Sequence, residues 1–233
     1  MKTLGILGGM SWESTLVYYR LLNQGVARRL GGLHSAPLIL HSVDFAAIAA
    51  LQRAGAWDEA ARQLGLAGRS LKQAGAQALL IATNTMHLVA QPVSESAGLP
   101  LLHIADATGR ALRAAGHARV GLLGTRFTME QSFLRDHLQR QHGVEALVPD
   151  AADRDVVHHV IFDELCRGTV SDASRTAYLA VIERLAQRGC TAAVLGCTEI
   201  GLLLPPGTPA ALPLFDTTVL HAEAALEWMC EDL

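Results

Sequence analysis

The chain has 233 residues, of which 19 are Lys or Arg and 22 are Asp or Glu, giving a formal net charge of −3. Half of the residues are hydrophobic and only 18% are charged, a composition that excludes a disordered chain. The slightly acidic balance, with no basic run, argues against a nucleic-acid partner, which would require a face of Lys and Arg side chains.

The sequence carries no signal for a membrane or for a resident metal. The apolar run that follows Met1 is too short and too rich in glycine for a signal peptide, and no stretch approaches the roughly 20 apolar residues of a membrane span. We therefore expect a cytoplasmic protein that keeps its cysteines as thiols. The spacing of His and Cys residues is not that of a zinc site, so we expect no metal.

Short apolar runs alternate with longer helical segments along the chain. The predicted strands, in chain order, are Thr3–Leu7, Pro37–Val43, Ala78–Ala82, Leu101–His103, Val120–Leu123, Glu145–Val148, Ala193–Leu195 and Leu212–Phe215. The predicted helices between them are Ser14–Leu30, Trp57–Ala74, Thr108–Ala115, Met129–Gln141, Asp153–Cys166 and Ser171–Arg188. Strands of buried character separated by helices predict an α/β fold with mainly parallel sheets, in which ligands bind beyond the carboxyl ends of the strands.

An internal repeat runs through this pattern. The segment 5–8 recurs at 121–124, the segment 73–85 recurs at 187–199, and the segment 99–101 recurs at 212–214, at offsets of 116, 114 and 113 residues. Three matches in the same order at nearly one offset predict two similar α/β domains. We expect a first domain of residues 1-112 plus 213-233 and a second domain of residues 113-212.

The repeat places Thr83 and Cys197 at equivalent positions, each just beyond the carboxyl end of a strand. If the domains face each other, the two side chains approach one cleft from opposite sides. That arrangement suits the removal of a proton from one face of a carbon and the return of a proton to the other. A free cysteine is often only a small buried apolar residue. The polar residues Thr198 and Glu199, which follow Cys197, favour a functional role.

At these residues the sequence resembles the aspartate/glutamate racemases, which are cofactor-independent amino-acid racemases. The resemblance rests on the segments 83–87 (TNTMH) and 196–199 (GCTE), supported by 8–14 (GGMSWES) and by Gln52-Arg53, and it spans nearly the whole chain. It implies two pseudo-symmetric α/β domains with the active site in the interdomain cleft. It also implies a two-base mechanism, with a cysteine in each motif serving one face of the amino acid's Cα. No cofactor is implied. The chain has only two lysines, Lys2 and Lys72, and neither is placed by the sequence for a pyridoxal-phosphate Schiff base.

The sequence departs from the family pattern at Thr83, where the family typically has a cysteine. A thiol has a pKa near 8.5, whereas an aliphatic hydroxyl is a poor base unless another group activates it. Cys197 is therefore the expected main base, and Thr83 is a weaker acid or base on the opposite side. By analogy with glutamate racemase, we predict faster turnover of the L- than of the D-enantiomer.

The remaining roles follow from charge. Donors around the α-carboxylate must stabilise the carbanion-like state, and the expected donors are Asn84, Thr85 and Thr198, which are equally suited to capping helices. Arg53 is the candidate for binding an acidic side chain, with Gln52 beside it. The further residues predicted to line or tune the site are Met10, Ser11, Thr125, Glu199 and His87. The pair His158-His159 is expected to be solvated on a helix, without a metal.

Other functions remain open at the level of sequence. A single cysteine suffices for decarboxylation of a disubstituted malonate or for isomerisation of an unsaturated diacid. A broad-specificity racemase and a non-catalytic carboxylate-binding descendant are also compatible with the sequence. A serine hydrolase is discounted because Glu13 replaces the last glycine of G-x-S-x-G, and a dinucleotide enzyme because G-x-G-x-x-G is absent. We expect a small amino-acid substrate as the partner, and a homodimer.

Overall fold

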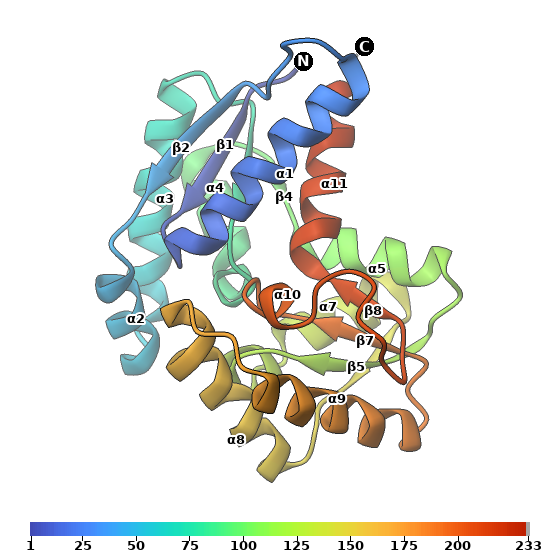
Figure 1. Cartoon of the computed structure of the whole chain (residues 1–233). Helices are drawn as coiled ribbons and strands as arrows, with labels where there is room; N and C mark the ends of the chain where they lie inside the picture. Colours follow the sequence, from blue (N-terminus) through green and yellow to red (C-terminus); the bar gives the residue numbers. More distant parts are fainter. Residues whose placement is uncertain (232–233) are drawn as a thin grey trace. The chain divides into compact units, whose positions relative to one another are not determined.

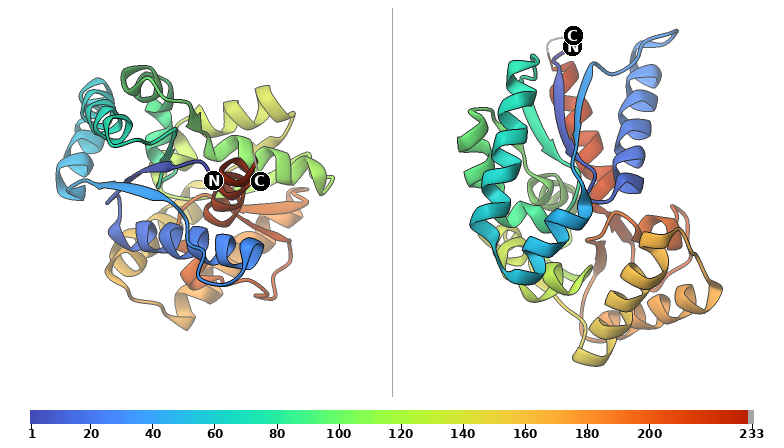
Figure 2. Two further views of the ribbon diagram at one scale, coloured as in Figure 1. Left: turned by 90° about the horizontal axis from the view of Figure 1, so that it is seen from above. Right: turned by 90° about the vertical axis from the view of Figure 1, so that its left-hand side faces the viewer.

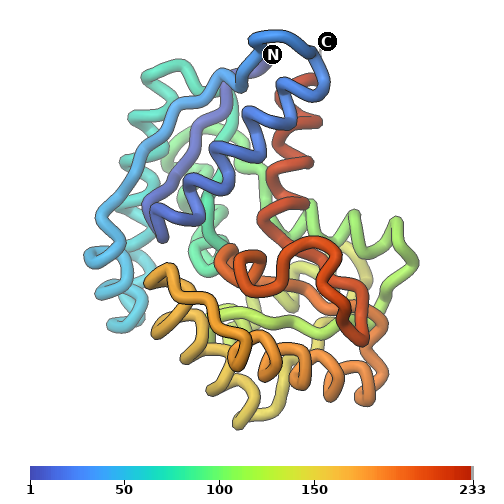
Figure 3. The backbone as a smooth tube through the Cα atoms, in the orientation of Figure 1, coloured from blue at the N-terminus to red at the C-terminus, as the bar shows by residue number. Residues whose placement is uncertain are grey.

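The computed structural model describes residues 1–231, and the chain forms two compact units (Figure 1). Unit 1 comprises Met1–His103 together with the chain from His221 onward, and unit 2 comprises Ile104–Leu220. The chain therefore leaves unit 1 once and returns to it within its last helix, as the tube in Figure 3 shows. The predicted domain boundaries, at 112/113 and 212/213, differ from this division.

Unit 1 contains a four-stranded parallel sheet. Its strands are β1 (Leu4–Gly8), β2 (Leu38–Ser42), β3 (Ala78–Ile81) and β4 (Leu101–Leu102), in the order β2-β1-β3-β4. Every residue of β1 and β3 is buried, as expected for strands at the centre of a parallel sheet. Leu7 is paired with Ile81, so the segments that follow β1 and β3 leave the same edge of the sheet side by side.

Helices cover both faces of this sheet (Figure 2). One face carries α1 (Trp12–Leu30) and α11 (Thr217–Cys230), which share a buried apolar cluster with β1 and β3. The other face carries α3 (Trp57–Gln73) and α4 (Ala90–Ala97), with α2 (Phe45–Ala54) beside them. The two helices of the first face approach closely, because a Cβ on Gly25 would lie only 2.1 Å from a methyl group of Leu226.

Unit 2 repeats this architecture. Its parallel strands β5 (Arg119–Leu123), β6 (Glu145–Leu147), β7 (Ala192–Leu195) and β8 (Leu214–Asp216) have the order β6-β5-β7-β8, the same pattern as in unit 1. Helices α5 (Ile104–Ala114) and α7 (Phe133–His142) pack on one face. Helices α8 (Ala151–His159) and α9 (Asp172–Gln187) pack on the other. Two equivalent sheets confirm the internal repeat and the α/β fold.

The predicted helices need two corrections in unit 2. The predicted helix Met129–Gln141 is two helices, α6 (Arg126–Glu130) and α7, because Gln131 is extended between them with ψ 143°. The predicted helix Asp153–Cys166 is α8 followed by a π-helical turn, Val160–Glu164, and a 3-10 turn. In the described part of the chain, no helix combines the length and the apolar character that crossing a membrane requires.

Candidate active site

Cys197 is the second residue after β7, in a tight segment that begins with Gly196. The Gly196 N–H donates to the carbonyl of Leu123, the last residue of β5, over 2.6 Å. A Cβ on Gly196 would lie 2.9 Å from that same carbonyl oxygen. Only glycine therefore allows the backbone to turn this close to β5, and the turn fixes where the Cys197 side chain begins.

The Cys197 thiol is buried and faces a carboxylate. Its Sγ donates a hydrogen bond to Oε2 of Glu199 over 3.0 Å, and the Thr198 hydroxyl donates to the same oxygen over 2.7 Å. Burial raises the pKa of Cys197 well above its usual value, and the negative charge of Glu199 raises it further. The resting form is consequently a thiol whose proton already points at an acceptor.

Thr83 occupies the equivalent place in unit 1, two residues after β3. Its side chain is half-buried, and its N–H donates to the carbonyl of Ile81 over 2.9 Å. Its own carbonyl accepts a hydrogen bond from Nδ1 of His87 over 2.8 Å. A carbonyl can only accept, so Nδ1 carries the proton and His87 is the Nδ1–H tautomer. Asn84 and Thr85 follow at buried positions, where a 3-10 turn (Thr85–Val89) begins.

Next to His87 lies a group of buried, hydrogen-bonded side chains that the sequence does not predict. Nε2 of His221 donates to the carbonyl of Leu102 over 2.8 Å, which leaves its Nδ1 to accept from the Tyr18 hydroxyl over 2.9 Å. The ring of His221 packs edge-on against His87, with centroids 5.6 Å apart. Tyr18 and His221 are 203 residues apart in the chain. The expected return of the C-terminal segment to the first domain is the only sequence signal that could have joined them.

The predicted residues Met10 and Ser11 lie after β1, beside the Thr83 segment at the same sheet edge. Ser11 is the N-cap of α1, and its hydroxyl accepts from the N–H of Ser14 over 3.3 Å. Met10 is buried in the apolar cluster under α2 and α3. Gly9 has φ +88°, and a Cβ there would lie 2.3 Å from the carbonyl oxygen of Val43, so the turn after β1 requires glycine.

Gln52 and Arg53 lie in the last turn of α2, one buried and the other exposed. Gln52 is buried, and its amide nitrogen lies 3.1 Å from the sulfur of Met86, so it contacts the segment that contains Thr83. Arg53 is exposed at the end of the helix. Within residues 1–231, no ion pair or hydrogen bond of its guanidinium is seen. The exposed guanidinium is therefore available to an anion.

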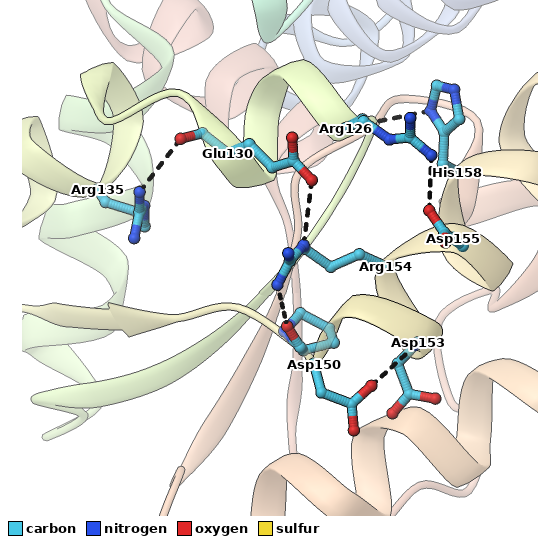
Figure 4. A network of polar contacts seen from close by, with 9 residues as sticks. Arg126, Glu130, Arg135, Asp150, Asp153, Arg154, Asp155 and His158 are labelled. Atoms are coloured by element: carbon cyan, nitrogen blue, oxygen red, sulfur yellow. Dashed lines mark hydrogen bonds and ion pairs between the residues drawn. The ribbon is translucent and has the colours of Figure 1, made fainter.

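Thr125 is the N-cap of α6, the short helix after β5. A Cβ on the preceding Gly124 would lie 2.9 Å from the carbonyl oxygen of Gly196, so the Thr125 and Cys197 segments lie side by side in unit 2. Two ion pairs, drawn in Figure 4, join α6 to α8. They are Arg126–Asp155 at 2.6 Å and Arg154–Glu130 at 3.2 Å. Both are partly exposed, so they orient α6 more than they stabilise it.

The same network corrects the expectation for the histidine pair. His158 is half-buried, and its Nδ1 accepts from the backbone N–H of Arg126 over 3.2 Å, whereas His159 is exposed as predicted. Burial lowers the pKa of His158, and the positive charge of Arg126 lowers it further. The neutral ring that results can accept the Arg126 hydrogen bond.

The structure thus gathers most of the predicted residues at the carboxyl edges of the two sheets, one edge in each unit. Met10, Ser11, Gln52 and the segment 83–85 meet in unit 1, and Thr125 and the segment 197–199 meet in unit 2. A pocket of about 600 Å³ also lies in unit 2, formed mainly by apolar side chains of residues 204–220 around Asp216. Its lining does not include the predicted residues. The lysines lie elsewhere, with Lys2 bound to Glu231 and Lys72 bound to the carbonyl of Gly98.

Comparison with known proteins places the chain in a family of racemases. A model of the Asp/Glu/hydantoin racemase family matches residues 7–225. The crystal structure of a candidate Asp/Glu racemase from Yersinia pestis is 51% identical, with a TM-score of 0.92 over 99% of this chain and 100% of that one. An aspartate racemase homologue from Pyrococcus horikoshii is 29% identical, with a TM-score of 0.85 over 99% of this chain and 100% of the other. The aspartate racemase of Picrophilus torridus, 20% identical with a TM-score of 0.73 over 99% of this chain and 95% of its own, shares the fold.

Proposed function

The chain belongs to the Asp/Glu/hydantoin racemase family, and from this premise we propose that it interconverts the enantiomers of aspartate or glutamate by proton transfer at Cα without a cofactor. In this proposal Cys197 is the main base, and Thr83 is a weaker proton donor and acceptor for the opposite face of the substrate. The observation that carries the proposal is the hydrogen bond from the Cys197 thiol to the Glu199 carboxylate.

That hydrogen bond gives the buried Cys197 thiol an acceptor for its proton. Because the pKa of Cys197 is raised, few thiolates form spontaneously at neutral pH, and an internal acceptor for the thiol proton is required. Glu199 supplies one at 3.0 Å, within the range of direct proton transfer. A substrate ammonium group close to Sγ would stabilise the thiolate that this transfer leaves.

The proposed reaction proceeds in balanced steps. Glu199 accepts the Sγ–H proton, and the Cys197 thiolate removes the Cα proton of the L-amino acid, which regenerates the thiol. The Thr83 hydroxyl, or a water held by it, gives a proton to the opposite face of the carbanion. Glu199 then releases its proton to solvent, and the hydroxyl recovers one from solvent, so no net proton is gained or lost.

Abstraction of the Cα proton, and therefore its exchange with solvent, has a different barrier on each face of the substrate. Removal of a proton from the D-enantiomer would require the Thr83 oxygen to act as a base. Cys197 is assisted by Glu199, two residues further along the chain, whereas the residue two positions after Thr83 is Thr85, which carries only a hydroxyl. We therefore propose faster exchange of the L- than of the D-enantiomer. The overall equilibrium is unchanged, because the enzyme alters barriers only.

The substrate carboxylates need separate partners. Backbone N–H groups and side chains of Asn84, Thr85 and Thr198 are proposed to hold the α-carboxylate, each donor being worth on the order of 3 kcal/mol in the transition state. Arg53 is proposed to bind the side-chain carboxylate, because its exposed planar guanidinium can bind a carboxylate bidentately.

Deuterium incorporation at Cα in D₂O, followed by NMR for each enantiomer of aspartate and glutamate, tests the proposal. We expect Cys197→Ser to lose at least a hundredfold in exchange of the L-enantiomer. Thr83→Cys should gain at least tenfold toward the D-enantiomer. Cys190→Ser is the matched control, because this second buried cysteine lies at the end of the turn that leads into β7, away from Glu199, and should exchange like the wild type.

Three results would contradict the proposal. One is unchanged exchange in Cys197→Ser, and another is D-exchange in the wild type as fast as L-exchange. The third is release of CO₂ from a disubstituted malonate without any Cα exchange of amino acids, which would indicate a decarboxylase instead.

A further inference from the structure

A group of histidine and carboxylate side chains lies where α5 and α7 pack against each other. The group comes from the first turn of α5, from α7 and from the residue directly before α5, and consists of His103, Asp106, His137 and His142. Ligand atoms of His103, Asp106 and His137 all lie within 4.8 Å of one another. Among residues 1–231, this is the one set of three His, Cys, Asp or Glu side chains close enough to share a metal ion.

The packing of the two helices holds these side chains in place. Ala105 of α5 shares a buried apolar cluster with Leu134 and Leu138 of α7. Asp106 directly follows Ala105, and His137 directly precedes Leu138, so both lie at the border of that cluster. The exposed fraction of the side chain is 37% for Asp106 and 25% for His137. An ion can therefore enter from solvent, while the packed helices keep its ligands in position.

Two imidazole rings share one oxygen of Asp106. Nε2 of His137 lies 2.6 Å from Oδ1, and Nε2 of His142 lies 2.9 Å from the same oxygen. Because a carboxylate can only accept, both rings donate from Nε2. The carboxylate and the Nε2 atom of His137 are thus already side by side before any ion binds, which lowers the cost of assembling a site.

A glycine makes the space for the His142 ring. Gly109 lies three residues after Asp106 on α5, and a Cβ there would lie 2.3 Å from two ring carbons of His142. Glycine in the middle of a helix is unfavourable, but here it admits the ring that holds Asp106 from outside. Carboxylates that bind metals are commonly oriented by such a hydrogen bond from a side chain that does not itself contact the ion.

The kinds of ligand select the class of ion. Two imidazole nitrogens and one carboxylate oxygen suit Zn²⁺, and three protein ligands leave a fourth position for water. Ligand atoms about 2.0–2.1 Å from a tetrahedral zinc ion lie roughly 3.3 Å apart. From a largest separation of at most 4.8 Å, the group has to contract by no more than roughly 1.5 Å, which side-chain rotation supplies. Nε2 of His137 then gives its lone pair to the ion, and Nδ1 carries the ring proton.

We propose that His103, Asp106 and His137 bind one Zn²⁺ ion, with His142 as a positioning residue for the Asp106 carboxylate. Zinc here is contrary to the expectation from sequence, because Asp106 and His137 lie 31 residues apart on two helices and not at the short spacing of a zinc motif. No step of the proposed racemisation passes through the ion. Zinc binding is measured without substrate, so its failure and the failure of the proposed function are distinguished.

Isothermal titration calorimetry of the metal-stripped full chain with ZnCl₂, in a buffer that does not bind zinc, tests the proposal. The wild type should bind one ion per chain with a Kd below about 10 μM. Asp106→Asn and His137→Ala should each weaken binding about a hundredfold or more, because each removes a ligand from a site that has only three. His159→Ala is the matched control, since His159 is an exposed histidine of the same unit outside the group, and this variant should bind zinc like the wild type.

Two variants test the role of His142. His142→Ala should weaken zinc binding by about tenfold to a hundredfold. Gly109→Ala should have a similar effect, because it displaces the same ring without removing it. Unchanged affinity in both variants would show that His142 does not position the carboxylate.

Anomalous diffraction at the zinc absorption edge locates the ion in wild-type crystals, and decides the question even if a variant does not fold. We expect a peak among His103, Asp106 and His137. A wild type that binds no zinc at concentrations up to about 100 μM would reduce the group to a hydrogen-bond network and overturn the proposal. A peak at any other place, or full affinity in both Asp106→Asn and His137→Ala, would overturn it equally.

Discussion

The buried histidine His221 makes the stability of unit 1 depend on pH. Burial lowers the pKa of its imidazole from 6.5 to about 4, because the ring is enclosed among α1, α11 and β4, and the nearby His103 lowers it further. Its hydrogen bond to the Leu102 carbonyl opposes this shift. The folded state thus holds a neutral ring, whereas an exposed histidine in the unfolded chain accepts a proton near pH 6.5.

The sign and size of the effect follow from linkage. Because the folded pKa lies below the unfolded one, the unfolded state binds more protons between pH 6.5 and 4, and stability is lost as the pH falls through this window. With folded and unfolded pKa values of about 4 and 6.5, His221 contributes about 2 kcal/mol less at pH 5.0 than at pH 7.5, and about 3 kcal/mol less below pH 4. His87, whose pKa burial also lowers, changes stability in the same direction.

Urea unfolding followed by tryptophan fluorescence measures this loss. All three tryptophans, Trp12, Trp57 and Trp228, lie in unit 1 with His221, so the signal reports on the relevant unit. His221→Gln keeps an N–H that can reach the Leu102 carbonyl but does not titrate. We expect it to lose about 2 kcal/mol less than the wild type between pH 7.5 and 5.0.

The exposed His34 provides the control for this comparison, because His34→Gln removes an imidazole without removing a buried one. This variant should lose as much stability on acidification as the wild type. Equal losses in His221→Gln and the wild type would refute the reasoning, since the buried ring would then not be the group that is protonated on unfolding.

Two further predictions concern the thiol and the helix contact. Glu199→Gln should reduce exchange of L-aspartate at pH 7 at least tenfold and make kcat/KM rise toward alkaline pH. The reason is that burial still raises the pKa of Cys197 while no internal base remains. An initial-rate pH profile equal to that of the wild type would contradict this. Gly25→Ala should cost about 1–3 kcal/mol, because its Cβ meets Leu226 at 2.1 Å. In urea unfolding, Gly25→Ala/Leu226→Ala should be less destabilised than the sum of its single variants, and strict additivity would refute the clash.

The strands and the repeat were predictable because their signal is local. Each of the eight predicted apolar runs contains or overlaps a strand of the structure, and the segments at 83 and 197 both follow a central strand by two residues. Buried parallel strands are short apolar runs bounded by glycine and polar residues, so the sequence itself marks where they end. The loops that carry the candidate residues could therefore be placed without any knowledge of tertiary contacts.

The environment of those residues was less predictable. Nothing local to Thr83 indicates that His87 binds its carbonyl or that Tyr18 and His221 form a buried, hydrogen-bonded group next to His87, because these contacts join segments up to 203 residues apart. Helix α11 has no clear polar face, so the pattern of apolar residues along it does not mark it as a helix. The break before α7 arises at one extended residue, Gln131. A helical pattern is recognised over several turns, so a single extended residue does not interrupt it visibly.

Duplication of one fold makes the difference between the equivalent residues Thr83 and Cys197 chemically informative. Thr83 follows β3 by two residues and Cys197 follows β7 by two residues, so the backbone places them equivalently in the two units. Their neighbours differ, because the thiol donates to a carboxylate two residues on, while the backbone at Thr83 is bound by a neutral histidine. Restoring a cysteine at position 83 would supply a nucleophilic atom without a base beside it. Thr83→Cys should therefore exchange the D-enantiomer more slowly than the wild type exchanges the L-enantiomer, and equal rates would contradict the role proposed for Glu199.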